Sequence, residues 1–218
     1  MTYTNTLADP RVATTLDRMF DLAERSETAL ERILAGQAGD FAAMTPQEQA
    51  DAAAEVYMPI DAEGGRLLYS LVRAARPETV VEFGTSFGIS TLYLAAAVRD
   101  NGAGRVVTTE LSTDKAAAAR RTFAETGLAD VITLLEGDAR ETLAGVPADF
   151  VLLDGWKDLC LPVLRLLEPR LAPGTLVVAD DIGLPDLRPY LAHVRDPANG
   201  YQSVTFPVAD GMELSCRL

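Results

Sequence analysis

Short apolar segments rich in β-branched residues alternate with helical segments after residue 78, and this alternation most constrains the fold. The expected strands cover 79–83, 106–110, 131–135, 150–154 and 175–179. The expected helices between them cover 89–99, 113–126, 139–143 and 158–171. Strands that are apolar along their length and alternate with helices are typical of a parallel sheet covered on both faces. The sequence therefore predicts a Rossmann-like, doubly wound α/β fold.

The end of the chain departs from this alternation. Segments 201–208 and 212–218 flank Ala209-Asp210-Gly211, which is a turn signal between two strands. We expect an antiparallel hairpin here. With the five earlier strands, it completes a mostly parallel sheet of seven.

Three helices are expected before the first strand. The first covers 9–36, where apolar residues recur at spacings of three and four and a glycine ends the pattern. The second begins at Thr45, which forms a capping box with Glu48, and ends near Tyr57. The third covers 61–75.

No linker rich in proline or glycine separates these helices from the sheet. We therefore expect 1–60 to be a helical extension and 61–218 to be the domain that carries the function. The extension is interpreted as a lid or a dimer surface. Its apolar side chains could face the body of the protein or a second copy in a homodimer, namely Leu16, Phe20, Leu30 and Ile33.

Charge and cysteine content exclude several classes of partner. The 218 residues include 32 acidic and 19 basic residues, a net charge of −13 that repels nucleic acid and anionic membrane surfaces. The longest apolar run, 92–98, is far shorter than the roughly 20 residues that cross a bilayer. Two cysteines without metal-binding spacing and no visible signal peptide favour the reducing cytoplasm.

A glycine-containing loop follows the first strand. Gly84 and Gly88 would let the backbone approach a ligand closely, as in sheets that bind ligands at their carboxyl edge. The spacing matches neither the dinucleotide fingerprint nor a phosphate-binding P-loop. Glu82 precedes the loop and Glu110 ends the second strand, where a carboxylate can hold ribose hydroxyls. An acidic surround also suits a cationic ligand such as the sulfonium of S-adenosylmethionine.

Three segments together resemble one family. These are Glu82-Phe83-Gly84-Thr85-Ser86-Phe87-Gly88, Leu153-Asp154-Gly155-Trp156-Lys157-Asp158 and Val178-Ala179-Asp180-Asp181. The chain resembles class I S-adenosylmethionine-dependent methyltransferases over roughly 57–218, and more narrowly the catechol and caffeoyl-CoA O-methyltransferase group. The run around Trp156 and Lys157 carries most of this narrower resemblance.

The resemblance implies a cofactor site along the carboxyl edge of the sheet. Gly84, Ser86 and Ser90 would line the methionine end, with Met58 closing over it, and Glu110 would hold the ribose. Segment 138–140 would frame the adenine. The residues predicted to bind S-adenosylmethionine are Met58, Glu82, Gly84, Ser86, Ser90, Glu110, Asp138, Ala139, Arg140 and Asp154.

Three carboxylates end two neighbouring strands. Asp154 ends the fourth strand, and Asp180 and Asp181 end the fifth, so parallel strands would bring them to one ion. Oxygen ligands with open positions fit Mg²⁺ first, and also Mn²⁺ or Ca²⁺. Metal-dependent members of the family usually have Asn at the position of Asp181. Because Asp181 adds a negative charge at this position, a metal-independent enzyme stays an open alternative.

The predicted reaction is methyl transfer to a hydroxyl of a small aromatic, catechol-like acceptor. By resemblance, Lys157 is the general base and Asp154 the second catalytic residue, while Trp156 and Lys157 contact the acceptor. An ordinary lysine is protonated, and burial beside a dication would favour its neutral form. Trp156 could equally be a core residue. A diphenol, polyketide or other aromatic natural product is favoured over a coenzyme A ester.

Three other functions stay open at this point. The first is a metal-independent O- or N-methyltransferase acting on small molecules. The second is an aminopropyl transferase, although Gly155-Trp156-Lys157 stands where its paired acidic residues are expected. The third is a non-catalytic cofactor-binding module that uses the first helices to bind a partner.

Overall fold

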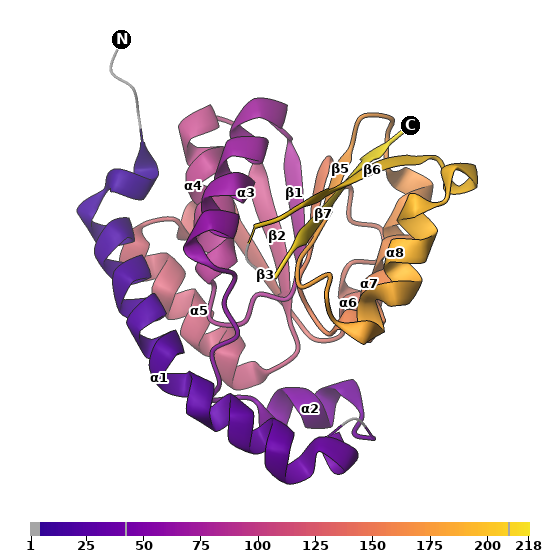
Figure 1. Ribbon diagram of the computed structural model, residues 1–218. Helices are drawn as coiled ribbons and strands as arrows, with labels where there is room; N and C mark the ends of the chain where they lie inside the picture. The colour runs from indigo at the N-terminus through magenta and orange to yellow at the C-terminus, as the bar shows by residue number, and fades with distance from the viewer. Residues whose placement is uncertain (1–4, 42, 209) are drawn as a thin grey trace.

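The computed structural model describes residues 5–41, 43–208 and 210–218, with side chains omitted for 27–40, and is built around one central sheet (Figure 1). Within these residues the sheet has seven strands in the order β3-β2-β1-β4-β5-β7-β6. Their bounds are β1 Thr79–Phe83, β2 Arg105–Glu110, β3 Ile132–Glu136, β4 Phe150–Leu153, β5 Leu176–Ala179, β6 Tyr201–Phe206 and β7 Met212–Arg217. The predicted fold class is confirmed.

Helices connect the strands as the alternation predicts. The α-helices are α1 Pro10–Phe41, α2 Pro46–Ala52, α3 Ala62–Ala75, α4 Ile89–Asn101, α5 Thr113–Thr126, α6 Ala139–Thr142, α7 Cys160–Leu167 and α8 Arg188–Arg195. Short 3₁₀ helices are η1 Thr6–Ala8, η2 Ala129–Val131, η3 Lys157–Leu159, η4 Glu168–Arg170, η5 Pro185–Leu187 and η6 Pro197–Asn199. None of the helices in the described part of the chain has the length and apolar character that a bilayer crossing requires.

Strand pairing places the topological switch between β1 and β4. Strands β1 to β5 pair in parallel, and β7 pairs antiparallel with both β5 and β6. Thus β7 alone runs against the other strands, and the predicted hairpin is present. Of its turn, Ala209 lies outside the described residues. A ligand cleft is expected at the carboxyl ends of β1 and β4, where the connections leave to opposite faces.

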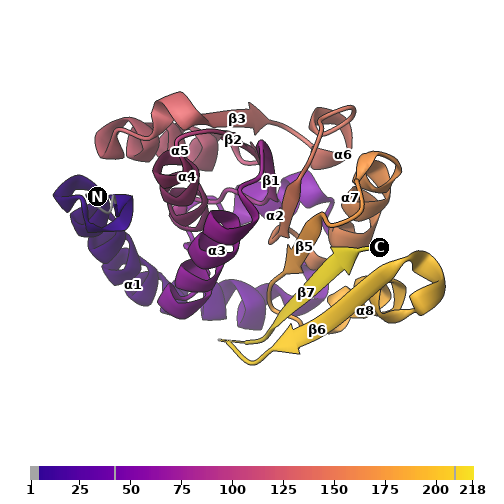
Figure 2. The same cartoon turned by 90° about the horizontal axis from the view of Figure 1, so that it is seen from above.

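Helices lie on both faces of the sheet (Figure 2), and each face carries its own apolar cluster. Alternate strand residues go to opposite clusters: Val80 and Val106 pack with α1, α3, α4 and α5, whereas Val81 and Val107 pack with α6, α7 and α8. All five residues of β1 are buried. This explains why these strands read as continuous apolar runs in the sequence.

The first helix differs from its prediction. It continues through Gly36 to Phe41 instead of ending at the glycine. A glycine inside a helix costs only about 1 kcal/mol relative to alanine, which the other contacts of a long helix outweigh. Leu16 is buried and Phe20 half-buried against the sheet cluster, so these two face the body of the protein. The side chains of Leu30 and Ile33 lie outside the described residues, and a homodimer stays a prediction.

The second helix begins as predicted and ends earlier. Thr45 Oγ1 accepts from the backbone of Glu48, and Glu48 Oε2 accepts from the Thr45 backbone at 2.8 Å, which completes the capping box. The helix ends at Ala52 rather than near Tyr57. Residues 53–55 form a turn, and an irregular connection then leads to Asp61, which caps α3.

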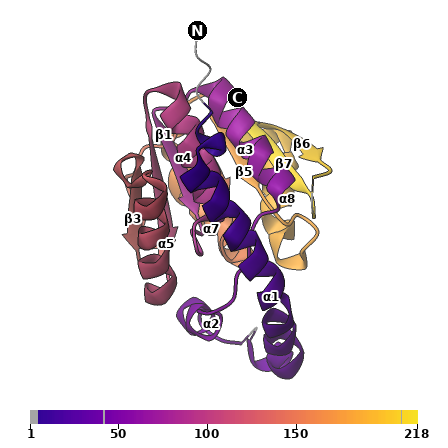
Figure 3. The same cartoon turned by 90° about the vertical axis from the view of Figure 1, so that its left-hand side faces the viewer.

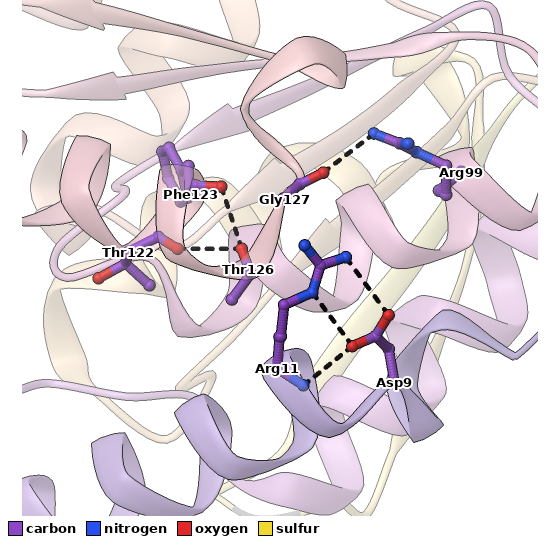
Figure 4. A network of polar contacts seen from close by, with 7 residues as sticks. All are labelled: Asp9, Arg11, Arg99, Thr122, Phe123, Thr126 and Gly127. Atoms are coloured by element: carbon purple, nitrogen blue, oxygen red, sulfur yellow. Dashed lines mark hydrogen bonds and ion pairs between the residues drawn. The ribbon is translucent and has the colours of Figure 1, made fainter.

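Helix α1 is fixed on the outside of the α4–α5 layer and leads to α2 near the lower end of the sheet (Figure 3). Arg18 donates to both carboxylate oxygens of Glu125 on α5, at 2.9 and 2.8 Å. At the start of α1, Asp9 accepts from Arg11, whose side chain lies beside Gly127 at the end of α5 (Figure 4). The extension therefore rests on the domain over its first half.

Gly88, at the start of α4, provides a stability test. Its φ is +98°, and a Cβ there would lie 2.6 Å from the ring of Phe123. Gly102 also has a positive φ, of +74°, but nothing lies within 4 Å of its Cβ position. We expect Gly88→Ala to lower the free energy of unfolding by about 2–4 kcal/mol and Gly102→Ala by only about 1 kcal/mol. Urea denaturation of both variants checks this, and equal losses would contradict it.

Candidate active site

A cavity of about 1350 Å³ opens at the carboxyl ends of the parallel strands. Its floor comes mainly from the loops after β1, β2, β3, β4 and β5. Its roof comes from the first helices and the connection before α3, namely Phe20, Ala23, Glu24, Phe41, Gln49, Ala50, Ala53, Tyr57, Met58, Pro59, Ile60, Asp61 and Ala62. The site expected at the topological switch is therefore a real cavity.

The glycine loop forms the centre of the floor. Gly84 has a φ of +101°, and a Cβ there would lie 2.7 Å from the carbonyl oxygen of Asp154. Only glycine lets the ends of β1 and β4 approach so closely. Ser86 also has a positive φ, of +48°, and its backbone N donates to Glu110 Oε2 at 2.7 Å. The loop thus holds Asp154 and Glu110 on the same edge.

Gly88 has a different role from the predicted one. It does not line the cavity, and the space that its missing Cβ leaves is filled by the ring of Phe123. Its small size serves the packing of α5 against the loop rather than the approach of a ligand.

Glu110 ends β2 with its carboxylate fixed by two backbone donors. Oε1 accepts from Ser112 N at 2.8 Å, and Oε2 accepts from Ser86 N. Burial raises the pKa of Glu110, while the backbone donors and nearby Lys115 oppose that shift. Each carboxylate oxygen keeps a lone pair for a further donor. The residue lines the cavity, as its predicted role requires.

Glu82 lies beneath the loop rather than in the cavity wall. Its side chain is completely buried, and Oε2 accepts from Thr91 Oγ1 and Thr108 Oγ1, both at 2.5 Å. Burial raises the pKa of Glu82 to about 7. The carboxyl group joins β1, β2 and α4, and the structure does not bring it among the lining residues. A direct cofactor contact from Glu82 is therefore not supported.

Most other predicted cofactor residues line the cavity. Ser90 and Met58 do so, as do Asp138 and Ala139 at the start of α6. Asp138 caps this helix by accepting from Arg140 N at 2.8 Å. Arg140 is absent from the lining, and its half-exposed guanidinium pairs with Asp138. A cofactor contact of Arg140 stays a prediction.

The three predicted aspartates converge beside the glycine loop. Asp154, Asp180 and Asp181 each offer an oxygen, and these atoms lie within 4.8 Å of one another. Lys157 Nζ is 2.9 Å from Asp154 Oδ1 and 2.9 Å from Asp181 Oδ2. Asp181 has a φ of +56°, a strained backbone that directs it to this cluster. Asp180 is buried, and its Oδ1 has no hydrogen-bond partner among the described residues.

The charges of this cluster oppose the expected neutral lysine. Burial lowers the pKa of Lys157, but the carboxylates of Asp154 and Asp181 outweigh it and raise that pKa well above its ordinary value. Burial raises the pKa of Asp154 and of Asp180, and the neighbouring carboxylates add to the rise for Asp180. As the structure stands, Lys157 is an ammonium that neutralises part of the aspartate charge.

Trp156 is both a wall of the cavity and part of the core. It lines the cavity, packs against the α7–α8 cluster, and meets Phe41 edge to face with ring centroids 5.9 Å apart. The sequence left open whether Trp156 is a wall of the pocket or a core residue, and in the structure it is both. Asp158, Leu184 and Asp186 line the cavity too.

Sequence reasoning missed two features of the wall. Lys115, in the first turn of α5, is buried and lines the cavity beside Glu110. Tyr57 and Phe87 stack face to face, with ring centroids 3.9 Å apart. Lys115 shares a helix face with buried Ala119 and Phe123, and this spacing was the available signal.

The fold and the cavity together define a class I methyltransferase domain. The family model described as a methyltransferase domain matches residues 81–182. A methyltransferase structure from Geobacter sulfurreducens aligns with a TM-score of 0.65 and 26% identity, covering 97% of this chain and 98% of that one. Cofactor-bound Rv0187 from MTB aligns with a TM-score of 0.67 and 27% identity, covering 88% and 95%.

Catechol O-methyltransferases are among the similar curated proteins. Catechol O-methyltransferase B of Danio rerio is 33% identical over 72% of this chain and 65% of its own length, slightly under two thirds. Catechol O-methyltransferase of Sus scrofa is 31% identical over 63% of this chain and 78% of its own length. The chain therefore belongs to the catechol O-methyltransferase family of S-adenosylmethionine-dependent O-methyltransferases, which confirms the resemblance stated above.

Proposed function

We propose that the protein transfers the methyl group of S-adenosylmethionine to a hydroxyl of a small, catechol-like aromatic acceptor, assisted by a divalent cation. The convergence of Asp154, Asp180, Asp181 and Lys157 beside the glycine loop carries this proposal. Residues 61–218 would perform the transfer, and 1–60 would cover the cavity. The catechol O-methyltransferase relatives support the choice of acceptor.

The cofactor fits the lining chemically. It supplies an electrophilic methyl group on a sulfonium, whose positive charge favours acidic surroundings. Nine acidic residues and two lysines are among the lining residues, the acidic ones being Glu24, Asp61, Glu110, Asp138, Asp154, Asp158, Asp181, Asp186 and Asp210. Glu110 would accept from the ribose hydroxyls, Gly84, Ser86, Ser90 and Met58 would hold the methionine end, and Asp138 and Ala139 would frame the adenine.

The aspartate cluster fits a hard divalent cation. Its ligand atoms are carboxylate oxygens within 4.8 Å of one another. The buried Oδ1 of Asp180, which has no hydrogen-bond partner among the described residues, is a ligand atom that an ion would satisfy. Asp154, Asp180 and Asp181 would hold Mg²⁺, with Mn²⁺ or Ca²⁺ as substitutes. A bound cation supplies Lewis acidity, which lowers the pKa of an acceptor hydroxyl.

Lys157 is the residue that we assign to the proton of the acceptor hydroxyl. Its Nζ is held by Asp154 and Asp181 at the floor of the cavity, next to the wall formed by Trp156. The two carboxylates raise the pKa of Lys157, so a base role requires their charge to be offset. Trp156 and Phe41 would orient the aromatic ring of the acceptor between them and the floor.

A metal-independent transfer is the second candidate, and two observations favour it. The ammonium of Lys157 already supplies a positive charge to Asp154 and Asp181 at 2.9 Å. Asp181 also adds a charge where relatives that use a metal usually have Asn. An enzyme of this kind would act on oxygen or nitrogen by positioning alone.

Chelation separates the two candidates. We expect the purified protein to form S-adenosylhomocysteine from S-adenosylmethionine and catechol, and chelation of divalent ions to lower the rate about 100-fold or more. Added Mg²⁺ should restore it. Phenol, which lacks the second hydroxyl, is the matched acceptor and should react far more slowly. An undiminished rate after exhaustive chelation would favour the metal-independent enzyme, and no transfer to any hydroxyl acceptor would contradict the proposed function.

A further inference from the structure

Lys115 is a buried ammonium with no assigned role. It is 97% buried, being 3% exposed, yet it contributes to the cavity lining. Its Nζ lies 5.5 Å from the centre of the Phe87 ring. No acceptor among the described residues hydrogen-bonds to or forms an ion pair with this Nζ, and Glu110 is the anion that acts on it electrostatically.

The distribution of lysine makes this position unusual. The chain has 19 basic residues, of which lysine provides only Lys115 and Lys157, and both line the cavity. All other basic side chains are arginines, and those with ion pairs lie at exposed or half-exposed positions such as Arg18, Arg120 and Arg195. Lys115 is therefore not part of a broad, positively charged surface.

Burial removes most of the water around the Lys115 side chain, and the nearby Phe87 ring compensates for that loss only in part, so the N–H donors at the cavity wall remain available to a ligand. Such a group is expected to find its acceptor in a ligand. The acceptor must be a neutral or negatively charged atom with a lone pair, on a molecule that fills the cavity beside Glu110. Burial lowers the pKa of Lys115 to about 8, opposed by Glu110, so the amine still carries its third proton at neutral pH.

We propose that Lys115 is a cofactor-binding residue whose Nζ donates to a hydroxyl oxygen of the ribose, next to Glu110, which accepts from the hydroxyl hydrogens. This inference rests on the proposed function. A cis-diol offers two O–H donors and lone pairs on the same two oxygens. Glu110, with a lone pair left on each oxygen, and Lys115, with unused N–H donors, form the complementary set. Together they distinguish a ribose from a sugar that lacks one hydroxyl.

The test measures binding of S-adenosylhomocysteine and of its 2′-deoxy and 3′-deoxy forms by isothermal titration calorimetry. Lys115→Met keeps the length and apolar stem of the side chain and removes the ammonium. Lys115→Arg keeps a donor and a charge. Arg121→Met, an exposed cation on the same helix, is the matched control for net charge. We expect Lys115→Met to weaken S-adenosylhomocysteine binding about 10- to 100-fold, because the loss of one charge-assisted hydrogen bond lowers affinity by about this factor. Arg121→Met should leave the affinity unchanged.

The deoxy compounds show whether the effect is local. For the analogue that lacks the accepting hydroxyl, Lys115→Met should cause almost no further loss, and Lys115→Arg should retain more affinity for the full ribose than Lys115→Met. Equal losses for all three compounds would mean a structural effect and overturn the inference, as would unchanged affinity in Lys115→Met. Failure of the unaltered protein to bind S-adenosylhomocysteine would overturn both this inference and the proposed function.

Discussion

Replacing Asp154 with alanine should lower kcat for methyl transfer to catechol by about 1000-fold or more. The change removes one of three converging carboxylates and the 2.9 Å partner of Lys157 at once. The acceptor hydroxyl then loses the group that we expect to hold its metal ion, and Lys157 is left with Asp181 alone. The rate of S-adenosylhomocysteine formation at saturating cofactor and catechol measures this effect.

Asp154→Asn is the matched variant for this test. The amide has nearly the same shape and its oxygen still accepts from Lys157, but the negative charge is gone. If the charge holds a cation, Asn should lower the rate nearly as much as Ala. Both proteins should unfold cooperatively, which excludes a collapsed site as the cause. Activity within about tenfold of the unaltered enzyme in both variants would refute the metal site.

Replacing Lys157 with alanine should lower kcat by about 100- to 10,000-fold while S-adenosylhomocysteine affinity is nearly retained. The physical reason is the loss of the group that handles the proton of the acceptor hydroxyl, at a place away from Glu110 and the adenosine end. Steady-state rates together with calorimetric binding of S-adenosylhomocysteine check the two halves of this expectation.

Lys157→Arg distinguishes proton transfer from simple charge pairing. A guanidinium keeps the positive charge between Asp154 and Asp181 but does not lose its proton in proteins. A base role predicts that Arg fails to rescue the rate. Substantial rescue by Arg would instead assign Lys157 to charge neutralisation, in agreement with its raised pKa and with a metal-independent mechanism.

The sheet and its helices could be predicted because their patterns are local. Both ends of β1 and of α5 are as predicted. The β-branched apolar run sets the ends of β1, and the capping residues Ser112 and Gly127 set the ends of α5. The convergence of Asp154 with Asp180 and Asp181 follows in the same way. Neighbouring parallel strands must bring their carboxyl ends to one edge.

Features that depend on distant contacts could not be predicted. The sequence places Gly36 as a helix end, but α1 runs past it to Phe41, which meets Trp156. Glu82 reads as a loop carboxylate, yet the hydroxyls of Thr91 and Thr108 hold it in the interior. The spacing of Lys115 with Ala119 and Phe123 indicates a buried helix face, but the sequence does not show that this lysine lines the cavity.

The cavity's floor and roof come from different stretches of the chain. The floor, which holds the carboxylates and the glycine loop, comes from residues 83–186 together with Asp210, whereas the roof residues, Phe20 to Ala62, all precede the first strand. Substitutions in the opening helices would therefore reshape the roof of the cavity while Asp154, Asp180, Asp181 and Lys157 stay in place.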